Sequence, residues 1–139
     1  MNERGSAPIW FLGLSICVLM VGALSAELWR IIGERQELVA IADAAAVAAA
    51  AVVDPDAYRA NGEIRIDEDE GTLRALAVIA GHSGGEDLSM PPMIVVSEDG
   101  SSVSVTVTRE VAFGLLRILA LDDDRFEVTG QAVAYPRTP

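Results

Sequence analysis

Apolar residues dominate the first fifty positions of the chain, and charged residues divide these positions into two parts. Residues 7–26 contain no charged residue, whereas residues 27–53 mix charged and apolar residues without any proline. A helix of twenty residues is about 30 Å long, which matches the hydrocarbon thickness of a bilayer. We therefore predict one continuous helix, with a transmembrane segment at 7–28 and an Ala-rich stem at 29–53.

A removable signal peptide is the alternative interpretation of the apolar run. Ala23 and Ser25 would supply the small residues that a cleavage site needs. The run is nevertheless longer than the usual hydrophobic region of about 7 to 15 residues, and the helical pattern continues past the site. Trp10 and Trp29 are separated by about 28 Å along a helix, as in an aromatic belt at each membrane interface. We expect the span to be retained.

The stem shows the periodicity of an amphipathic helix. Apolar residues recur at spacings of three, four and seven: Leu28, Ile31, Ile32, Leu38, Val39, Ala42, Ala46 and Ala49. Arg30 and Glu34 have the spacing of an i, i+4 ion pair. These residues predict one apolar face for packing and a charged remainder.

The end of the stem is almost pure alanine. Residues 44–51 are all Ala except Val47, which combines the highest helix propensity with a small side chain. Small side chains allow another element to approach closely, so we predict an interaction surface here, with the following site residues: Asp43, Ala45, Ala46 and Ala49. The alternative is that these alanines only fill the helix.

Residues 54–139 have the pattern of one small α+β domain. Asp54 and Pro55 end the stem, and a loop is expected through Asn61 and Gly62. Asp67 and Glu70 have the spacing of a capping box, which predicts a helix over 68–82. Its expected buried face is as follows: Leu73, Leu76, Ala77 and Ala80.

Alternating residues predict a small antiparallel sheet in the second half of this domain. Asp99-Gly100, the dipeptide typical of a type I′ turn, separates the strands 93–98 and 101–109. Val103, Val105 and Val107 then face inward. A short apolar helix at 113–119 and a strand at 126–135 follow. The predicted fold class is α+β, with the long transmembrane-plus-stem helix packed on a sheet of about three strands.

Charge and composition exclude several functions. The formal net charge is -11, which argues against nucleic acid as a partner, because nucleic-acid-binding proteins need a basic surface. Cys17 lies in the span, and His82 has no second histidine or cysteine with which to build a metal site or a catalytic triad. The acidic runs 67–70 and 122–124 lack the EF-hand pattern. We expect no catalytic residue, cofactor or metal, and therefore no enzyme.

Several motifs of the first half resemble the N-terminal module of TadE/TadG-like proteins of Flp (Tad) pilus assembly. The residues that carry the resemblance are Arg4-Gly5-Ser6-Ala7, Leu28, Arg30, Arg35, Leu38 and the block from Ala42 to Ala50 with Asp43 inside it. The resemblance implies a single-pass pilin-like protein of the cell membrane, with residues 1–6 cytoplasmic and residues 54–139 extracytoplasmic. It implies the lipid bilayer, other pilin-like subunits and Tad assembly-platform proteins as partners.

The chain departs from this family at two points. Members that are cleaved by prepilin peptidase resemble one another in a Glu five residues after the Gly, but Trp10 stands there, so cleavage between Gly5 and Ser6 is not expected. The von Willebrand-type domain of long members has no room in the chain. The alternative functions are a free-standing, membrane-anchored extracytoplasmic module that binds a ligand on its sheet, and an enzyme.

Overall fold

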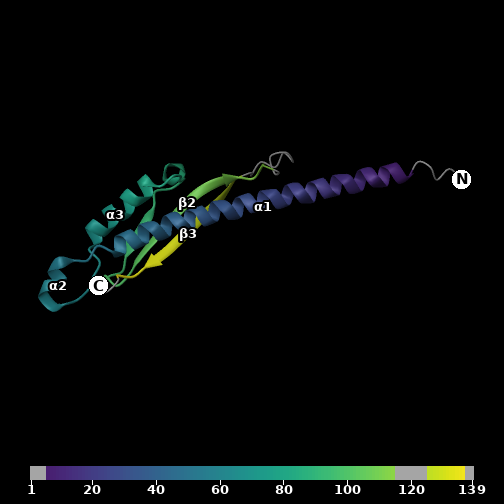
Figure 1. The fold of residues 1–139 in the computed structure, drawn as a ribbon. Coiled ribbons are helices and arrows are strands. Elements are labelled where there is room, and N and C mark those ends of the chain that lie inside the picture. Colours follow the sequence, from purple (N-terminus) through teal and green to yellow (C-terminus); the bar gives the residue numbers. More distant parts are fainter. Residues whose placement is uncertain (1–5, 115–124, 137–139) are drawn as a thin grey trace.

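The chain folds as an α+β protein, which confirms the predicted class (Figure 1). The structure is a computed structural model that describes residues 6–114 and 125–136. Its elements are the helices α1 (Ser6–Ala50), α2 (Pro55–Asn61) and α3 (Glu68–Gly81), the 3₁₀ turn η2 (Gly85–Asp87) and the strands β1 (Met93–Val96), β2 (Val103–Ala112) and β3 (Arg125–Ala134).

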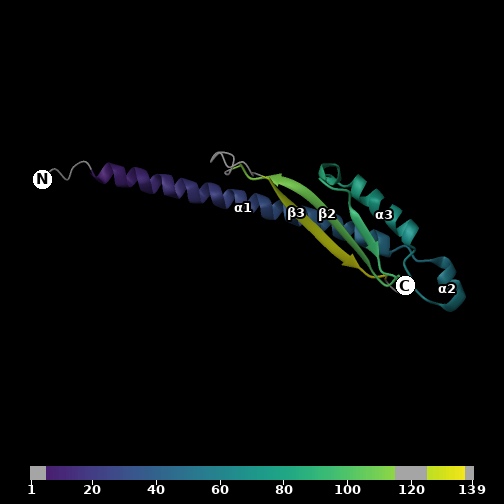
Figure 2. The same ribbon diagram turned by 180° about the vertical axis from the view of Figure 1, so that it is seen from behind.

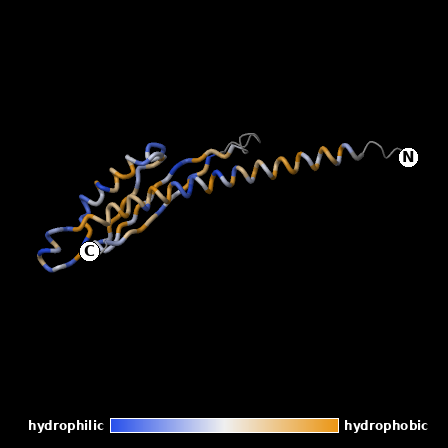
Figure 3. The backbone as a smooth tube through the Cα atoms, viewed as in Figure 1, coloured by the Kyte–Doolittle hydropathy of each residue, from blue (hydrophilic) through white to orange (hydrophobic). Residues whose placement is uncertain are grey.

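The helix α1 extends far beyond the rest of the fold. Its N-terminal half projects away from the sheet in both ribbon views (Figures 1 and 2), and it carries a nearly continuous apolar sequence (Figure 3). Among the described residues, α1 is the one helix long and apolar enough to cross a membrane, and its most apolar window is entirely exposed. This long apolar helix is compatible with membrane anchoring.

The three strands form an antiparallel sheet in the order β1-β2-β3. Val105 lies opposite Ile94 of β1 and Ala132 of β3. Val103, Val105 and Val107 are completely buried, which confirms the predicted inward face of β2. The intervening serine and threonine residues lie on the opposite, polar face.

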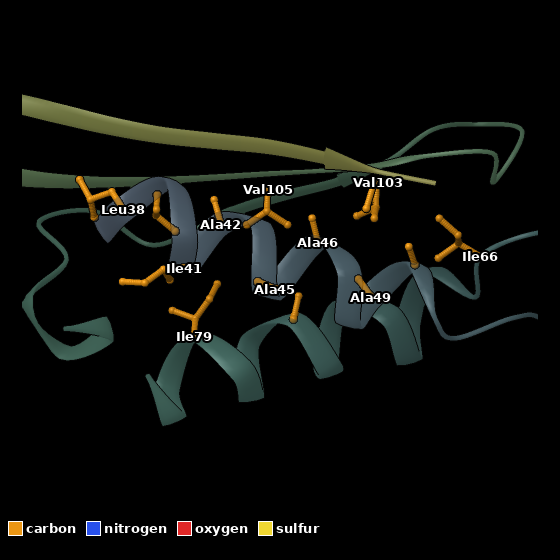
Figure 4. Packing of buried hydrophobic residues seen from close by; sticks show 14 residues of the cluster. Leu38, Ile41, Ala42, Ala45, Ala46, Ala49, Ile66, Ile79, Val103 and Val105 are labelled. Atoms are coloured by element: carbon orange, nitrogen blue, oxygen red, sulfur yellow. The ribbon is translucent and has the colours of Figure 1, made fainter. Parts of the chain in front are cut away.

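The C-terminal half of α1 lies between the sheet and α3 (Figure 4). Residues four apart form one row along a helix, and α1 uses two such rows. Leu38, Ala42 and Ala46 face the strands, whereas the second row faces α3 (Figure 4): Ile41, Ala45 and Ala49. The stem is therefore the middle layer of the domain.

The predicted buried face of α3 is wrong. Leu73 is 65% exposed and Leu76 is 40% exposed, while the residues that pack on α1 are Gly71, Ala75 and Ile79. A Cβ atom added at Gly71 would lie 3.3 Å from the carbonyl oxygen of Ala49. Because α3 lies close to the alanines of α1, small residues of α3 face α1, and Leu73 and Leu76 stay exposed.

The predicted single apolar face of the stem is also partly wrong. Val39 is 40% exposed, and Leu28 and Ile32 are each 50% exposed. Ile41 and Ala45, which the single-face pattern left out, are completely buried. The reason is that α1 is covered from two sides, so its buried surface is wider than one stripe and is displaced from the predicted one.

The segment predicted as a loop after the stem contains the helix α2. The stem itself ends at Ala50, and Val53 forms an isolated antiparallel bridge with Ile66. The Asp54 carboxylate accepts hydrogen bonds from the backbone N–H groups of Asp56 and Ala57, and Pro55 occupies the first turn. Asp54 therefore starts a helix as an N-cap, in addition to ending the stem.

The start of α3 confirms half of the predicted capping box. The Asp67 carboxylate accepts a hydrogen bond from the Glu70 N–H at 3.0 Å. The N–H of Asp67, which a capping box would leave for the Glu70 side chain, donates instead to the carbonyl of Val52 at 3.0 Å. The N-cap is thus tied to the end of the stem.

The hairpin between β1 and β2 is present, but its turn differs from the prediction. Ser97 N–H donates to the carbonyl of Ser102, and Gly100 N–H donates to the carbonyl of Ser97. Residues 98–101 therefore form a four-residue loop in place of a two-residue type I′ turn, with Gly100 in the left-handed region at φ 67°. Most of the helix predicted at 113–119 lies outside the described residues.

Candidate functional site

The predicted interaction residues of the stem lie in two different environments. Ala45, Ala46 and Ala49 are completely buried inside the chain, against its own sheet and α3. Their close packing is therefore intramolecular. Asp43 is exposed and lines a groove of about 610 Å³ together with Val47, Val133 and Tyr135.

The stem and the sheet approach each other closely at Gly130. A Cβ atom added there would lie 2.6 Å from both the carbonyl oxygen of Leu38 and the backbone nitrogen of Val39. Ala132 and Ala134 follow on the same face of β3, because alternate residues of a strand point to one side. The small residues of β3 thus allow α1 to pack close to the strand. The alternation Gly-x-Ala-x-Ala in the sequence could have predicted this close packing.

A buried arginine joins the stem to the sheet and to the loop after α3. Arg109 is 8% exposed. Its Nη1 donates to Glu34 at 2.7 Å and to Glu37 at 3.5 Å, and its Nη2 donates to the carbonyl of Gly84 at 2.7 Å. One side chain from β2 therefore fixes two other parts of the chain.

The charge of Arg109 is stabilised where it lies. Burial opposes the charged form, but the hydrogen bonds to Glu34 and Glu37 outweigh burial and raise the pKa of Arg109. Glu34 pairs with Arg109 and not with Arg30, so the expected i, i+4 pair is wrong. The sequence contained a signal for this cluster, because Arg109 continues the inward alternation of Val103, Val105 and Val107.

A second polar contact joins α1, at the boundary between the predicted span and the stem, to the end of β2. The Glu27 carboxylate accepts hydrogen bonds from the Gly114 N–H at 2.9 Å and from Arg30 Nη2 at 2.6 Å. Arg30 also donates to the carbonyl of Ala112. Together with the Arg109 cluster, this contact fixes the sheet along the stem at two levels.

The described ranges 6–114 and 125–136 bring together no group of three or more His, Cys, Asp or Glu residues that could hold a metal ion. Asp67 serves as the cap of α3. His82 ends the same helix, where its N–H donates to the carbonyl of Ile79 at 3.2 Å. The acidic run 122–124 lies outside the described residues. The candidate features of the described residues are therefore the groove beside Asp43 and the polar contacts that hold the stem on the sheet.

No family model, curated protein or solved structure matches the chain. The fold, its contacts and the exposed half of α1 therefore carry the functional argument.

Larger side chains are expected to destabilise the domain at the buried alanines and not at an exposed one. Ala45→Leu pushes the stem against α3 and Ala46→Leu pushes it against the sheet, so each is expected to lower the free energy of unfolding by about 1 to 3 kcal/mol. Ala40, which is exposed on the same helix, provides the matched control, because leucine is also a good helix former. Denaturant unfolding of the full chain in detergent micelles checks this order, and equal stability of all three variants would contradict it.

The hairpin loop predicts an acidic titration at Asp99. Hydrogen bonds from the hydroxyl of Ser97 and from the backbone and hydroxyl of Ser101 lower the pKa of Asp99 from 3.8 to about 2. The stabilisation that ionised Asp99 gives to the loop is therefore present above pH 3.8 and is lost as the pH falls toward 2. A carboxyl NMR titration should show this midpoint, and Ser101→Ala should raise it. A midpoint at the ordinary aspartate value would refute the loop geometry.

Proposed function

We propose that the chain is a membrane-anchored, pilin-like component of Flp (Tad) pilus assembly that acts by packing its helix against partner subunits. In this proposal α1 crosses the membrane once, its N-terminus is cytoplasmic and the α+β domain is extracytoplasmic. The observation that carries the proposal is the division of α1 into two halves. The domain encloses the second half, and the apolar first half extends beyond the domain without cover.

The exposed half of α1 needs an apolar environment. Large residues along it are strongly exposed, for example Trp10 at 78%, Leu19 at 72% and Val21 at 65%. Each large apolar side chain that remains in water forgoes roughly 1.5 to 3 kcal/mol of burial free energy. Lipid or other helices supply that burial, and both are partners in the proposal.

The same half also has surfaces that suit helix packing in a membrane. Gly13 and Gly22 have open space where a side chain would be, and small residues let transmembrane helices approach closely. The buried alanines, in contrast, are occupied by the domain. The proposed contacts with pilin-like subunits and with Tad assembly-platform proteins therefore lie on residues 7–28, and the alanine block serves to hold the domain on the stem.

A span exchange tests this proposal. In cells of the natural host from which the gene has been deleted, the full chain is expected to restore pilus or secretion output. A chain in which residues 7–26 are replaced by an unrelated apolar span of equal length is expected to reach the membrane without restoring that output. The variant Ala40→Leu provides a matched control with an intact span. Full output from the exchanged chain would refute a role for the span in assembly.

The second candidate function is a free-standing anchored module that binds a ligand on its sheet. The outer face of the sheet favours it, because polar side chains such as Ser104 and Gln131 lie there, joined by a hydrogen bond of 3.2 Å. The described elements leave this face uncovered, since α1 and α3 lie on the opposite side (Figure 4). The span exchange separates the two functions, because a ligand-binding module needs only an anchor.

A further inference from the structure

The end of the sheet nearest the apolar half of α1 carries two phenylalanines outside the core. Phe113 follows β2 and Phe126 lies at the start of β3. Their ring centroids are 6.0 Å apart at an interplanar angle of 78°, which is the edge-to-face geometry of a stable aromatic pair. Phe126 is nevertheless 48% exposed, so this pair presents apolar surface at the tip of the domain.

Hydrogen bonds to α1 place this aromatic tip at the level where the predicted span ends. Gly114, next to Phe113, donates to Glu27, and Ala112, on its other side, accepts from Arg30. The transmembrane segment predicted from the sequence ends at residue 28. Both ribbon views show the ends of β2 and β3 alongside α1 at this level (Figures 1 and 2).

We infer that Phe113 and Phe126 dock into the headgroup region of the bilayer that α1 crosses, so that the domain contacts the membrane directly as well as through its helix. The inference rests on the proposed membrane anchoring. Trp29 lies about 3 Å farther along the helix axis than Glu27 and is 76% exposed. Phe113, Phe126 and Trp29 therefore lie at a similar level along α1, and aromatic side chains are enriched at the membrane–water interfaces of membrane proteins.

Charge at the tip favours an interface of zwitterionic lipid. Among the residues of the tip that the structure describes, Glu27 pairs with Arg30 at 2.6 Å and Glu110 pairs with Arg125 at 3.3 Å, so each of these pairs is neutral. The net charge of -11 for the whole chain opposes attraction to anionic lipid. Burial of the aromatic rings is what holds the tip in the interface. Docking fixes the tilt of the domain, because the tip and the span then bind the bilayer at two points.

Fluorescence quenching by lipid tests the inference on the full chain in phosphatidylcholine vesicles. Phe113→Trp and, separately, Phe126→Trp are placed in a background with Trp10→Phe and Trp29→Phe. The lipids carry bromine near the headgroup end of their acyl chains. Tyr135→Trp in the same background is the matched control, because Tyr135 is 68% exposed at the opposite end of β3. A chain that keeps only Trp29 reports whether the helix is inserted.

We expect Trp29 and both tip tryptophans to lose most of their fluorescence in brominated vesicles, while the tryptophan at position 135 keeps its own. Quenching of Trp29 without quenching at either tip position would overturn the docking and leave the anchoring intact. An unquenched Trp29 would overturn the anchoring and the docking together. Circular dichroism of each variant confirms that the domain is folded, and the two tip variants check each other.

Discussion

Replacing Gly130 with alanine is expected to lower the free energy of unfolding by about 3 kcal/mol, at the upper end of the range for overpacked sites. The added methyl group would lie 2.6 Å from the backbone of Leu38 and Val39. A flexible side chain could move aside, but the backbone of a helix cannot, so α1 must lift from β3. Denaturant unfolding of the full chain in micelles, followed by circular dichroism, measures the loss.

Gly33→Ala is the matched control for this change. A Cβ atom added at Gly33 meets nothing within 4 Å, and alanine in a helix is more favourable than glycine by about 0.5 to 1 kcal/mol. The control is therefore expected to be neutral or slightly stabilising. If Gly130→Ala unfolded at the same denaturant concentration as the unchanged chain, the stem would not lie on β3 as the structure describes.

Replacing Arg109 with methionine is expected to lower the free energy of unfolding by about 2 to 3 kcal/mol. The removal of one partner from a buried ion pair is costly because the other charge stays behind. The side chains of Glu34 and Glu37 are 27% and 40% exposed, so solvent reduces this cost. The carbonyl of Gly84 also loses its hydrogen bond.

Two further variants separate the ion pair from general effects of the substitution. Changing Glu34 and Glu37 to glutamine together with Arg109→Met removes the stranded charges and should recover part of the stability. Arg59→Met breaks an ion pair in which both side chains are at least 75% exposed, and such surface pairs contribute about 0 to 1 kcal/mol. Equal effects of Arg59→Met and Arg109→Met would contradict a structural role for the buried cluster.

The periodicity of the sequence was sufficient to predict the long helix α1, the helix α3, the three strands and the side of the sheet that is buried. The alternation around Val105 predicted β2 and its inward face, and the strand expected at 126–135 is found at Arg125–Ala134. The long helix and its packing on the sheet followed from the absence of proline between residues 9 and 53 and from the alanines. These features depend on local pattern, which a sequence displays directly.

The faces of the helices could not be predicted in the same way, because tertiary contacts chose them. Hydrophobicity alone favours Leu73 and Leu76 as the buried face of α3, whereas the structure buries Gly71 and Ala75 to approach the stem. α2 was missed because it contains no buried residue and therefore lacks an apolar period. Its signal was the cap at Asp54.

The polar contacts of the candidate site were only partly visible in the sequence. Arg109 stood at an inward position of β2 and so required a partner, but sequence spacing alone does not choose Glu34 and Glu37 over other acids. The small side chains of the alanine block predicted close packing, and Ala45, Ala46 and Ala49 are completely buried. Only the structure shows that its partners lie within the same chain, which moves the proposed contacts with other subunits to the exposed half of α1.

Site-specific cross-linking in native membranes tests the central claim most directly. Single cysteines are placed at Gly22, in the exposed half of α1, and at Ala45, in the enclosed half, in a Cys17→Ala background. The proposal predicts cross-linked complexes with partner helices from position 22 and only single chains from position 45. Single chains from position 22 and from its neighbours through one helical turn would contradict assembly through the span.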